Sequence, residues 1–104
     1  MSVLLEFAMF PTDKGKSVSE YVSKIIELIR DSNFPYQLTP MGTIVETETL
    51  TQALKIVEQS YKVLRPDCDR VYSSIKLDIK KNQTGMMEQK IKSIETKIGK
   101  VNTD

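Results

Sequence analysis

The order of apolar and polar residues changes its period along the chain, and each period predicts a different kind of element. Residues 3–10 are almost all apolar and end at Pro11, which favours a short buried strand over a helix. After a polar stretch, apolar residues recur every three or four positions between 18 and 29. This spacing predicts a helix over about 17–32.

The next elements are predicted to be a hairpin and a second helix. β-Branched and aromatic residues at 36–39 and 43–47 flank residues 40–42, a Pro-Met-Gly sequence that favours a turn. An apolar stripe with helical spacing then extends over 50–64 and stops before a proline.

The last part of the chain contains one alternating segment and one further segment with helical spacing. Over 71–80 apolar and polar residues alternate with period two, which is typical of a strand with one buried face. Over 87–101 apolar residues step by four and three positions, which predicts a third, lysine-rich helix with a narrow apolar stripe. We expect this extra helix to cover another surface of the molecule.

Two capping-box patterns mark the starts of the first two helices. Ser17 stands three residues before Glu20, and Thr49 stands three residues before Gln52. In such a box the hydroxyl accepts a hydrogen bond from the later residue's amide, and the later side chain bonds back to the first amide. We therefore expect Ser17 and Thr49 to cap their helices.

The element order βαββαβ followed by a helix predicts an α+β fold of the ferredoxin-like type. In this arrangement two helices cover one face of a four-stranded antiparallel sheet and the other face is open. We expect residues 1–104 to form this single domain. The open face should carry Leu4, Phe10 and Tyr72, which are too apolar for a fully solvated surface, so pairing with another subunit is expected.

Composition narrows the classes of function. Fifteen Lys and Arg against fourteen Asp and Glu give a net charge of +1, which provides no general attraction for nucleic acid or an anionic membrane. Histidine is absent, so the commonest metal ligand and general base are missing. The single Cys68 fits a reducing cytoplasm, and no apolar run approaches the roughly 18 residues of a membrane span. We predict a cytoplasmic protein without a metal, cofactor, nucleic-acid or membrane partner.

Three segments carry a resemblance to a known family. Residues 7–22, 40–46 and 68–71, in this order, resemble the thiamine-binding protein family, which was long uncharacterised and is related to YkoF-like binders of hydroxymethylpyrimidine and thiamine. The resemblance covers nearly the whole chain. It implies a ferredoxin-like subunit, assembly into dimers and tetramers through sheets and edges, and binding of thiamine or its pyrimidine moiety without turnover. Asn33 and Thr47 stand where the family often has glycine; asparagine tolerates the left-handed backbone that glycine allows.

The chemistry of thiamine suggests which side chains would form a pocket. Its aminopyrimidine is flat and has donors and acceptors on its edge, and its thiazolium ring is positively charged. Phe10 and Met41 are candidate walls, since an aromatic face or a thioether packs against a heterocycle; ordinary packing is the alternative for both. Thr43 is a candidate hydrogen-bond partner of the pyrimidine edge, or simply a residue that favours the hairpin.

Two further residues are candidate polar contacts. Ser19 lies in the first turn of the predicted helix, with ordinary solvation as its alternative. Glu46 is a candidate acceptor from the pyrimidine or counter-charge for the thiazolium, with Glu6 as a weaker alternative. Because Thr43 and Glu46 differ in strand parity, they can contact one ligand only at a sheet edge or between subunits, unless a bulge intervenes.

The leading hypothesis is a non-enzymatic binding protein for thiamine or a related pyrimidine, acting in supply, storage or sensing. The alternative is a ferredoxin-like regulatory or assembly module that acts through homo-oligomerisation without a small-molecule ligand. A third hypothesis, an enzyme that uses Glu6 and Glu46 as paired carboxylates, ranks below both.

Overall fold

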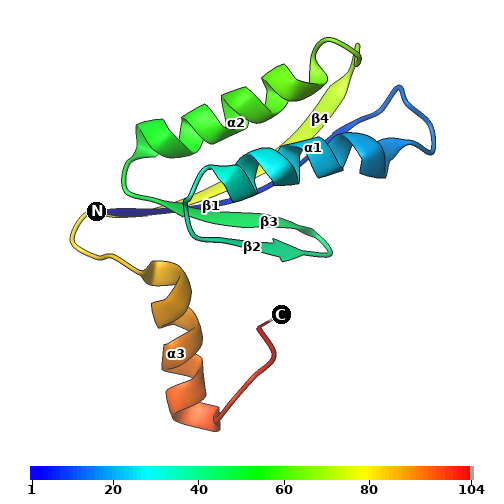
Figure 1. Cartoon of the computed structure of the whole chain (residues 1–104). Helices are drawn as coiled ribbons and strands as arrows, with labels where there is room; N and C mark the ends of the chain where they lie inside the picture. Colours follow the sequence, from blue (N-terminus) through cyan, green and yellow to red (C-terminus); the bar gives the residue numbers. More distant parts are fainter. Residues whose placement is uncertain (104) are drawn as a thin grey trace.

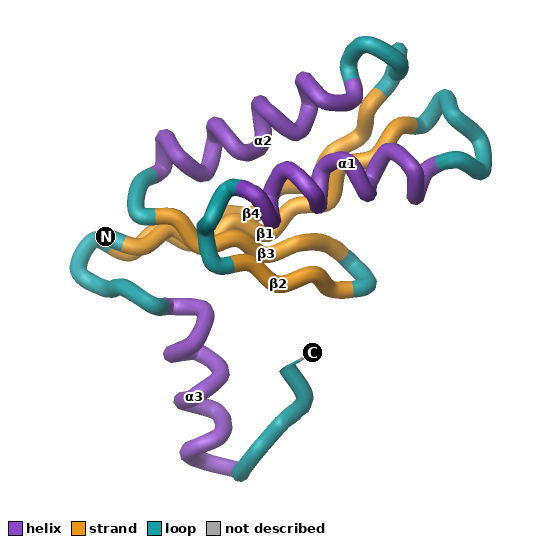
Figure 2. Tube along the Cα trace, in the orientation of Figure 1, coloured by secondary structure: helices purple, strands orange, loops and turns teal. Residues whose placement is uncertain are grey.

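The computed structural model describes residues 1–103, which form four strands and three helices. Figure 1 shows the chain from end to end, and Figure 2 shows the same view by secondary structure. In chain order the elements are β1 (Ser2–Pro11), α1 (Val18–Asp31), β2 (Tyr36–Thr39), β3 (Gly42–Thr47), α2 (Leu50–Leu64), β4 (Val71–Lys80) and α3 (Met86–Ile98).

The strands form one antiparallel sheet in the order β2-β3-β1-β4. Helices α1 and α2 cover one face of this sheet, and α3 lies on the other side (Figure 1). This is the predicted ferredoxin-like arrangement with an extra C-terminal helix. Between the sheet and the first two helices lies the main hydrophobic core, built from Val3, Leu5, Phe7, Met9, Ile25, Ile29, Val45, Ala53, Ile56, Leu64 and Cys68.

The strands differ in length, and this difference creates a notch beside the end of β1. β1 pairs with β4 along its whole length, from Ser2 to Pro11. Its last pair with β3 joins Phe7 to Thr43, because the chain turns at the start of β3. Residues 8–11 of β1 therefore extend beyond the hairpin and have no strand on that side within the described chain.

The two predicted capping boxes have different outcomes. Thr49 has extended backbone angles, its hydroxyl accepts from the Gln52 amide at 3.1 Å, and the Gln52 side chain accepts from the Thr49 amide at 3.1 Å. That box is confirmed. The Ser17 box is wrong: Ser17 has φ −88° and ψ 19° and its side chain makes no capping bond. The physical reason is that a capping side chain reaches the helix amides from an extended backbone, which Ser17 does not adopt.

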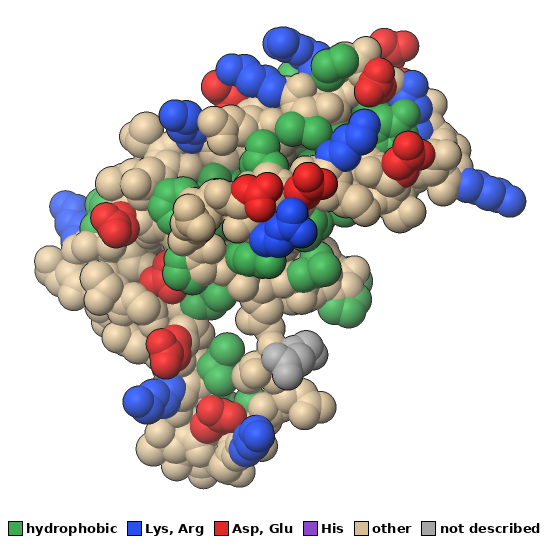
Figure 3. Space-filling model, viewed as in Figure 1, with side chains coloured by type: hydrophobic (Ala, Val, Ile, Leu, Met, Phe, Trp, Pro, Cys, Tyr) green, Lys and Arg blue, Asp and Glu red, His purple; other side chains and the backbone are tan. Residues whose placement is uncertain are grey.

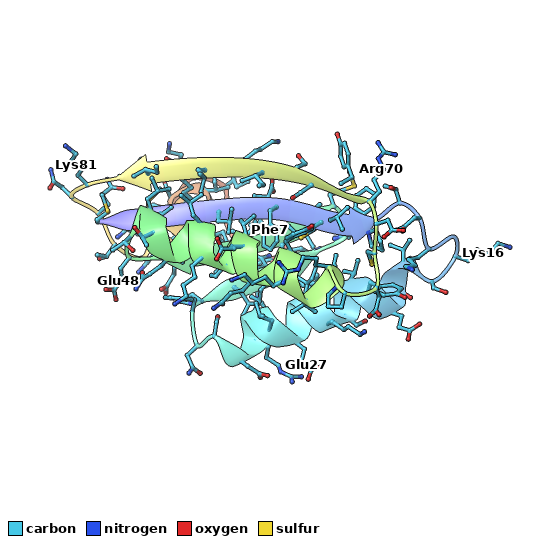
Figure 4. The ribbon with its side chains drawn as sticks, turned by 90° about the horizontal axis from the view of Figure 1, so that it is seen from above. Phe7, Lys16, Glu27, Glu48, Arg70 and Lys81 are labelled. Atoms are coloured by element: carbon cyan, nitrogen blue, oxygen red, sulfur yellow. The ribbon has the colours of Figure 1, made fainter. Side chains whose placement is uncertain are left out.

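Strand β4 only partly fulfils the prediction of a buried face. Ile75, Leu77 and Ile79 point to the helix-covered side, opposite Phe7, Leu5 and Val3 of β1. They nevertheless remain 44%, 39% and 44% exposed. Seen from above, β4 runs outside the two helices that cover the rest of the sheet (Figure 4), so its apolar row lacks a cover within the subunit.

Helix α3 covers part of the face that was expected to be open. Leu4 and Ile44 on that face line a hollow together with Met87 and Ile91 of α3. Further along the helix Ile98 is 72% exposed. Figure 3 shows α3 projecting from the body of the molecule, with apolar side chains on its inner side. The third helix therefore packs mainly through its first half.

The two positions where the resemblance expects glycine are accommodated differently. Asn33 has φ +67°, the left-handed conformation that asparagine tolerates, just after α1. Thr47 is buried within β3, and its hydroxyl donates to the Thr49 carbonyl at 2.9 Å. Thr47 keeps its regular pairing with Val3 between β3 and β1.

Candidate ligand-binding site

A cavity of about 350 Å³ opens in the notch where β1 outruns β3. This volume falls within the range of small-ligand sites. Three parts of the chain form its walls: the end of β1, the inner side of α1 and the β2–β3 turn. Its lining residues are Phe7, Ala8, Met9, Phe10, Val22, Ile25, Ile26, Leu38, Thr39, Pro40, Met41, Gly42 and Thr43.

The backbone of Met9 supplies main-chain polar groups to this cavity. The Thr12 amide donates to Arg70 just beyond β4, so even-numbered residues of β1 direct their N–H and C=O groups toward β4. Odd-numbered residues direct theirs toward β3, as the short approach of the Phe7 carbonyl to Gly42 also indicates. At Met9 the strand β3 is absent. One donor and one acceptor of the main chain therefore face the notch.

The turn that forms the opposite wall is held by a threonine side chain. The Thr39 hydroxyl accepts from the Met41 and Gly42 amides at 3.2 and 3.1 Å and donates to the Gly42 carbonyl at 2.7 Å. A Cβ atom at Gly42 would lie 3.1 Å from the Phe7 carbonyl oxygen. Glycine is therefore needed for the close approach of the turn to β1.

Three of the residues predicted from sequence lie together around this cavity. Thr43 is buried beside the core, and Met41 is 89% exposed at the tip of the turn. Phe10 lines the cavity from the end of β1, and its ring centroid lies 5.8 Å from that of Tyr72. The cavity thus combines an aromatic ring, a thioether and a hydroxyl group.

Ser19 lies close to this group but in a neighbouring hollow. That hollow runs along the outer side of α1 and shares Val22, Ile26 and Leu38 with the cavity. The Ser19 side chain is exposed. The main-chain carbonyl of Ser19 accepts a hydrogen bond from the Ser23 hydroxyl at 2.7 Å. A ligand that fills the cavity would reach Ser19 only by extending past these apolar side chains.

The structure does not bring Glu46 into the cavity. Glu46 lies near the other end of β3 and on the opposite face from Thr43, as its strand parity requires. Its carboxylate accepts from the Ser2 hydroxyl at 2.6 Å and from the Met86 and Met87 amides at 2.8 and 3.1 Å. Glu46 therefore caps the first turn of α3 from a distant strand.

These contacts also set the acidity of Glu46. Burial raises the pKa of its carboxyl group, but the hydrogen bonds from Ser2, Met87 and Met86 outweigh burial and lower the pKa below its usual value of 4.5. The fold therefore stabilises the ionised form of Glu46. Glu6, the weaker alternative, lies 3.8 Å from Lys76 in an exposed ion pair.

Three further features of the described residues concern a thiol, metal ligands and membrane spans. Cys68 is a buried free thiol, and burial is the main reason why its pKa is raised. In residues 1–103 no group of three or more His, Cys, Asp or Glu is placed to hold a metal ion. Within the same residues no helix is long and apolar enough to cross a bilayer.

Sequence reasoning missed Met9 and the α1 residues as part of the cavity lining. The apolar pattern assigned Met9 and Val22 to their elements correctly but carried no information on where β3 would stop relative to β1. Gly42 was the available signal, since a glycine that begins a strand often marks a close backbone approach.

The fold and the cavity together define a ferredoxin-like domain with a ligand-sized pocket at a strand end. The chain belongs to the thiamine-binding protein family, whose sequence profile matches residues 5–95. Membership in this family supports a thiamine-related role.

Relatives and solved structures agree with this assignment. A UPF0045 protein of Methanocaldococcus jannaschii is 36% identical over 92 residues, which cover 88% of this chain and 91% of the relative. A UPF0045 protein of Mycobacterium bovis is 33% identical over 95 residues, covering 91% and 93%.

The solved structure of the M. jannaschii protein has a TM-score of 0.79 at 35% identity and covers 89% of this chain and 95% of its own. A Thermotoga maritima structure, named for thiamine biosynthesis or salvage, has a TM-score of 0.77 at 20% identity and covers 89% and 99%, which shows a shared fold.

Proposed function

We propose that this protein binds thiamine or a related hydroxymethylpyrimidine in the notch cavity, without turning it over. The observation that carries the proposal is the main-chain edge of β1 at Met9, which lies beyond the last pair with β3 and lines an apolar cavity of suitable size. An aminopyrimidine has a donor and acceptors on one edge, so it can pair with this N–H and C=O much as a further strand would.

The remaining walls suit the rest of such a ligand. Phe10 offers an aromatic face and Met41 a thioether, both of which pack against a flat heterocycle, and an aromatic face also attracts a cation. The Thr43 hydroxyl lies in the wall formed by the hairpin. Because Glu46 is engaged with α3, the positive thiazolium ring would rely on Phe10 and on solvent for its stabilisation.

Two observations favour binding over catalysis. The chain has no histidine, and its two carboxylates considered for acid–base work, Glu6 and Glu46, lie outside the residues that line the cavity. Each is held by another part of the chain, Glu6 by Lys76 and Glu46 by α3. A supply, storage or sensing role in the cytoplasm is the corresponding proposal for the cell.

Titration calorimetry with thiamine, hydroxymethylpyrimidine and thiamine phosphates tests the proposal. We expect binding of thiamine or the pyrimidine, and we expect Thr43→Val to weaken it by about fivefold, the equivalent of about 1 kcal/mol for one hydrogen bond. Thr51→Val, on the exposed surface of α2, is the matched control. The absence of heat and of a thermal shift at millimolar ligand would contradict the proposal.

We also propose that the subunit self-associates into dimers or tetramers. The support is apolar surface left exposed by the subunit, including Tyr72 at 55% on the sheet face opposite α1 and α2. Light scattering at micromolar concentration checks this part independently of ligand, and a stable monomer would refute it.

A further inference from the structure

The hollow beside Ser19, which we call the α1 hollow, adjoins the notch cavity and has a volume of about 430 Å³. Three apolar side chains line both spaces: Val22, Ile26 and Leu38. The other side chains that line the α1 hollow are polar or charged: Ser19, Ser23, Glu27 and Arg30. A molecule that starts in the notch cavity therefore meets a second, more polar compartment where it passes α1.

Helical spacing explains why these polar residues line one hollow. Ser19, Ser23, Glu27 and Arg30 follow one another at intervals of four, four and three residues. This spacing places them in a row on one side of α1. Figure 4 shows Glu27 on the side of α1 that faces away from α2. Leu38 of β2 supplies the wall from the sheet and is 57% exposed.

The two compartments differ in charge. No residue that lines the notch cavity carries a charge. In the α1 hollow Arg30 is offset by Asp31, with 3.2 Å between the Arg30 Nε and an Asp31 carboxylate oxygen. Lys24, one turn from Glu27, pairs with Asp67 at 4.0 Å. None of the ion pairs within residues 1–103 involves Glu27, so its carboxylate is the charge left to meet a ligand.

We propose that the α1 hollow binds the thiazolium ring of a thiamine whose pyrimidine occupies the notch cavity, with Glu27 as its counter-charge. The α1 hollow acts only together with the notch cavity, so its role rests on the proposed function. The methylene bridge of thiamine crosses the three apolar side chains that line both compartments. The complete site then selects a pyrimidine joined by a short link to a flat cation, and a neutral pyrimidine fills only its notch half.

The walls of the α1 hollow suit this occupant. A thiazolium ring is flat and only weakly hydrated, so it packs against apolar side chains such as Val22 and Leu38 while its charge faces a carboxylate. In the notch cavity the ring would have Phe10 and solvent, but no ionised partner. Because Glu27 is exposed, the attraction is of the surface kind and changes affinity by about fivefold at most.

Titration calorimetry with thiamine and with hydroxymethylpyrimidine, which lacks the thiazolium ring, tests the role of Glu27. Glu27→Gln should raise the dissociation constant of thiamine about fivefold and change that of hydroxymethylpyrimidine by less than about twofold. Glu58→Gln is the control: it makes the same change of charge at an exposed position on α2 and lines neither compartment. It should leave both dissociation constants nearly unchanged.

Ser23→Arg tests the place of the ring while Glu27 is kept. Ser23 lines the α1 hollow but not the notch cavity, and it precedes Glu27 by four residues. An arginine at this position occupies the hollow and can pair with the Glu27 carboxylate. It should weaken thiamine binding at least as much as Glu27→Gln does and leave hydroxymethylpyrimidine binding unchanged.

The outcomes separate this site from the notch cavity. The α1 hollow is excluded as the thiazolium site by equal effects of Glu27→Gln on both ligands, by an effect on thiamine no larger than that of Glu58→Gln, or by binding of hydroxymethylpyrimidine without binding of thiamine. Each of these results leaves the notch cavity as a pyrimidine site. A wild-type protein that binds neither compound overturns both proposals.

Discussion

Glu46 illustrates how the same side chain can fit two roles until its neighbours are known. Its position in a motif shared with Thr43 made it a candidate partner for a cationic ligand. In the structure its oxygens accept from the Ser2 hydroxyl and from two amides of α3. A carboxylate at a helix N-terminus is favoured both by hydrogen bonds and by the helix dipole. The residue therefore joins the sheet to the third helix.

Glu46→Gln should lower the free energy of unfolding at neutral pH by about 1–3 kcal/mol, because it removes a charged acceptor from three buried or partly buried donors. The folded pKa of Glu46 lies below its usual value of 4.5. Its ionised form thus contributes stability above about pH 4.5, and this contribution is lost as the pH falls through the folded pKa. Chemical denaturation of both proteins across this pH range measures the difference.

The exposed Glu48→Gln is the matched control for this prediction and should leave stability nearly unchanged. A gap between wild type and Glu46→Gln that does not narrow at low pH would argue against the capping role of the ionised carboxylate.

At the scale of elements, the two helix starts show that a sequence pattern needs a compatible backbone. Ser17 and Thr49 have the same capping-box spacing, but only Thr49 has the extended backbone from which a hydroxyl reaches the first turn. Ser17 instead closes a short turn in which its amide donates to the Lys14 carbonyl at 3.2 Å. The loop before α1, with Gly15 at φ +56°, determines this geometry.

Alanine substitution at the two positions should therefore have unequal effects. Thr49→Ala should cost about 1 kcal/mol of stability, because it removes the hydrogen bond to the Gln52 amide. Ser17→Ala should cost less than about 0.5 kcal/mol, since no capping bond is lost. Urea denaturation of the two variants gives the comparison, and equal losses would mean that Ser17 caps α1 in solution.

The order of elements and the sheet were predictable from the sequence, whereas the cavity was predictable only in part. Period two at 71–80 and helical spacing at 50–64 are periodic signals that identify a strand and a helix directly. The point where β3 stops beside β1 leaves no such periodic signal, so the lack of a β3 partner beside Met9 was missed. The exposure of Leu77 was also hidden, because an apolar row has the same pattern whether its own helix or another subunit covers it.

For the whole molecule, α3 accounts for an extended shape. The radius of gyration is 14.9 Å, against about 13 Å for a compact chain of 100 residues. The principal extents are 45 × 28 × 21 Å, and α3 projects from the body in Figure 3. Its first residue, Met86, is buried, whereas Ile94 in the apolar stripe is 48% exposed. The helix is held at its start and loosely packed toward its end.

Hydrogen exchange should record this difference. Amides in the second half of α3, from Ser93 to Ile98, should exchange at least about tenfold faster than those of β1 and β3, because opening this part exposes little buried apolar surface. Mass spectrometry of peptides from the folded protein measures both regions. Equal protection of α3 and β1 would show that another surface, such as a second subunit, covers the helix.

The carboxylate that holds α3 also implies an order of folding. Glu46 and Met86 are far apart in the sequence, and Glu46 occupies its place only after β3 has paired with β1, where Ser2 supports it. A short isolated helix gains little stability by itself in water. α3 should therefore dock last, after the strands and the first two helices have assembled, and a chain arrested before this step would still contain the notch at Met9.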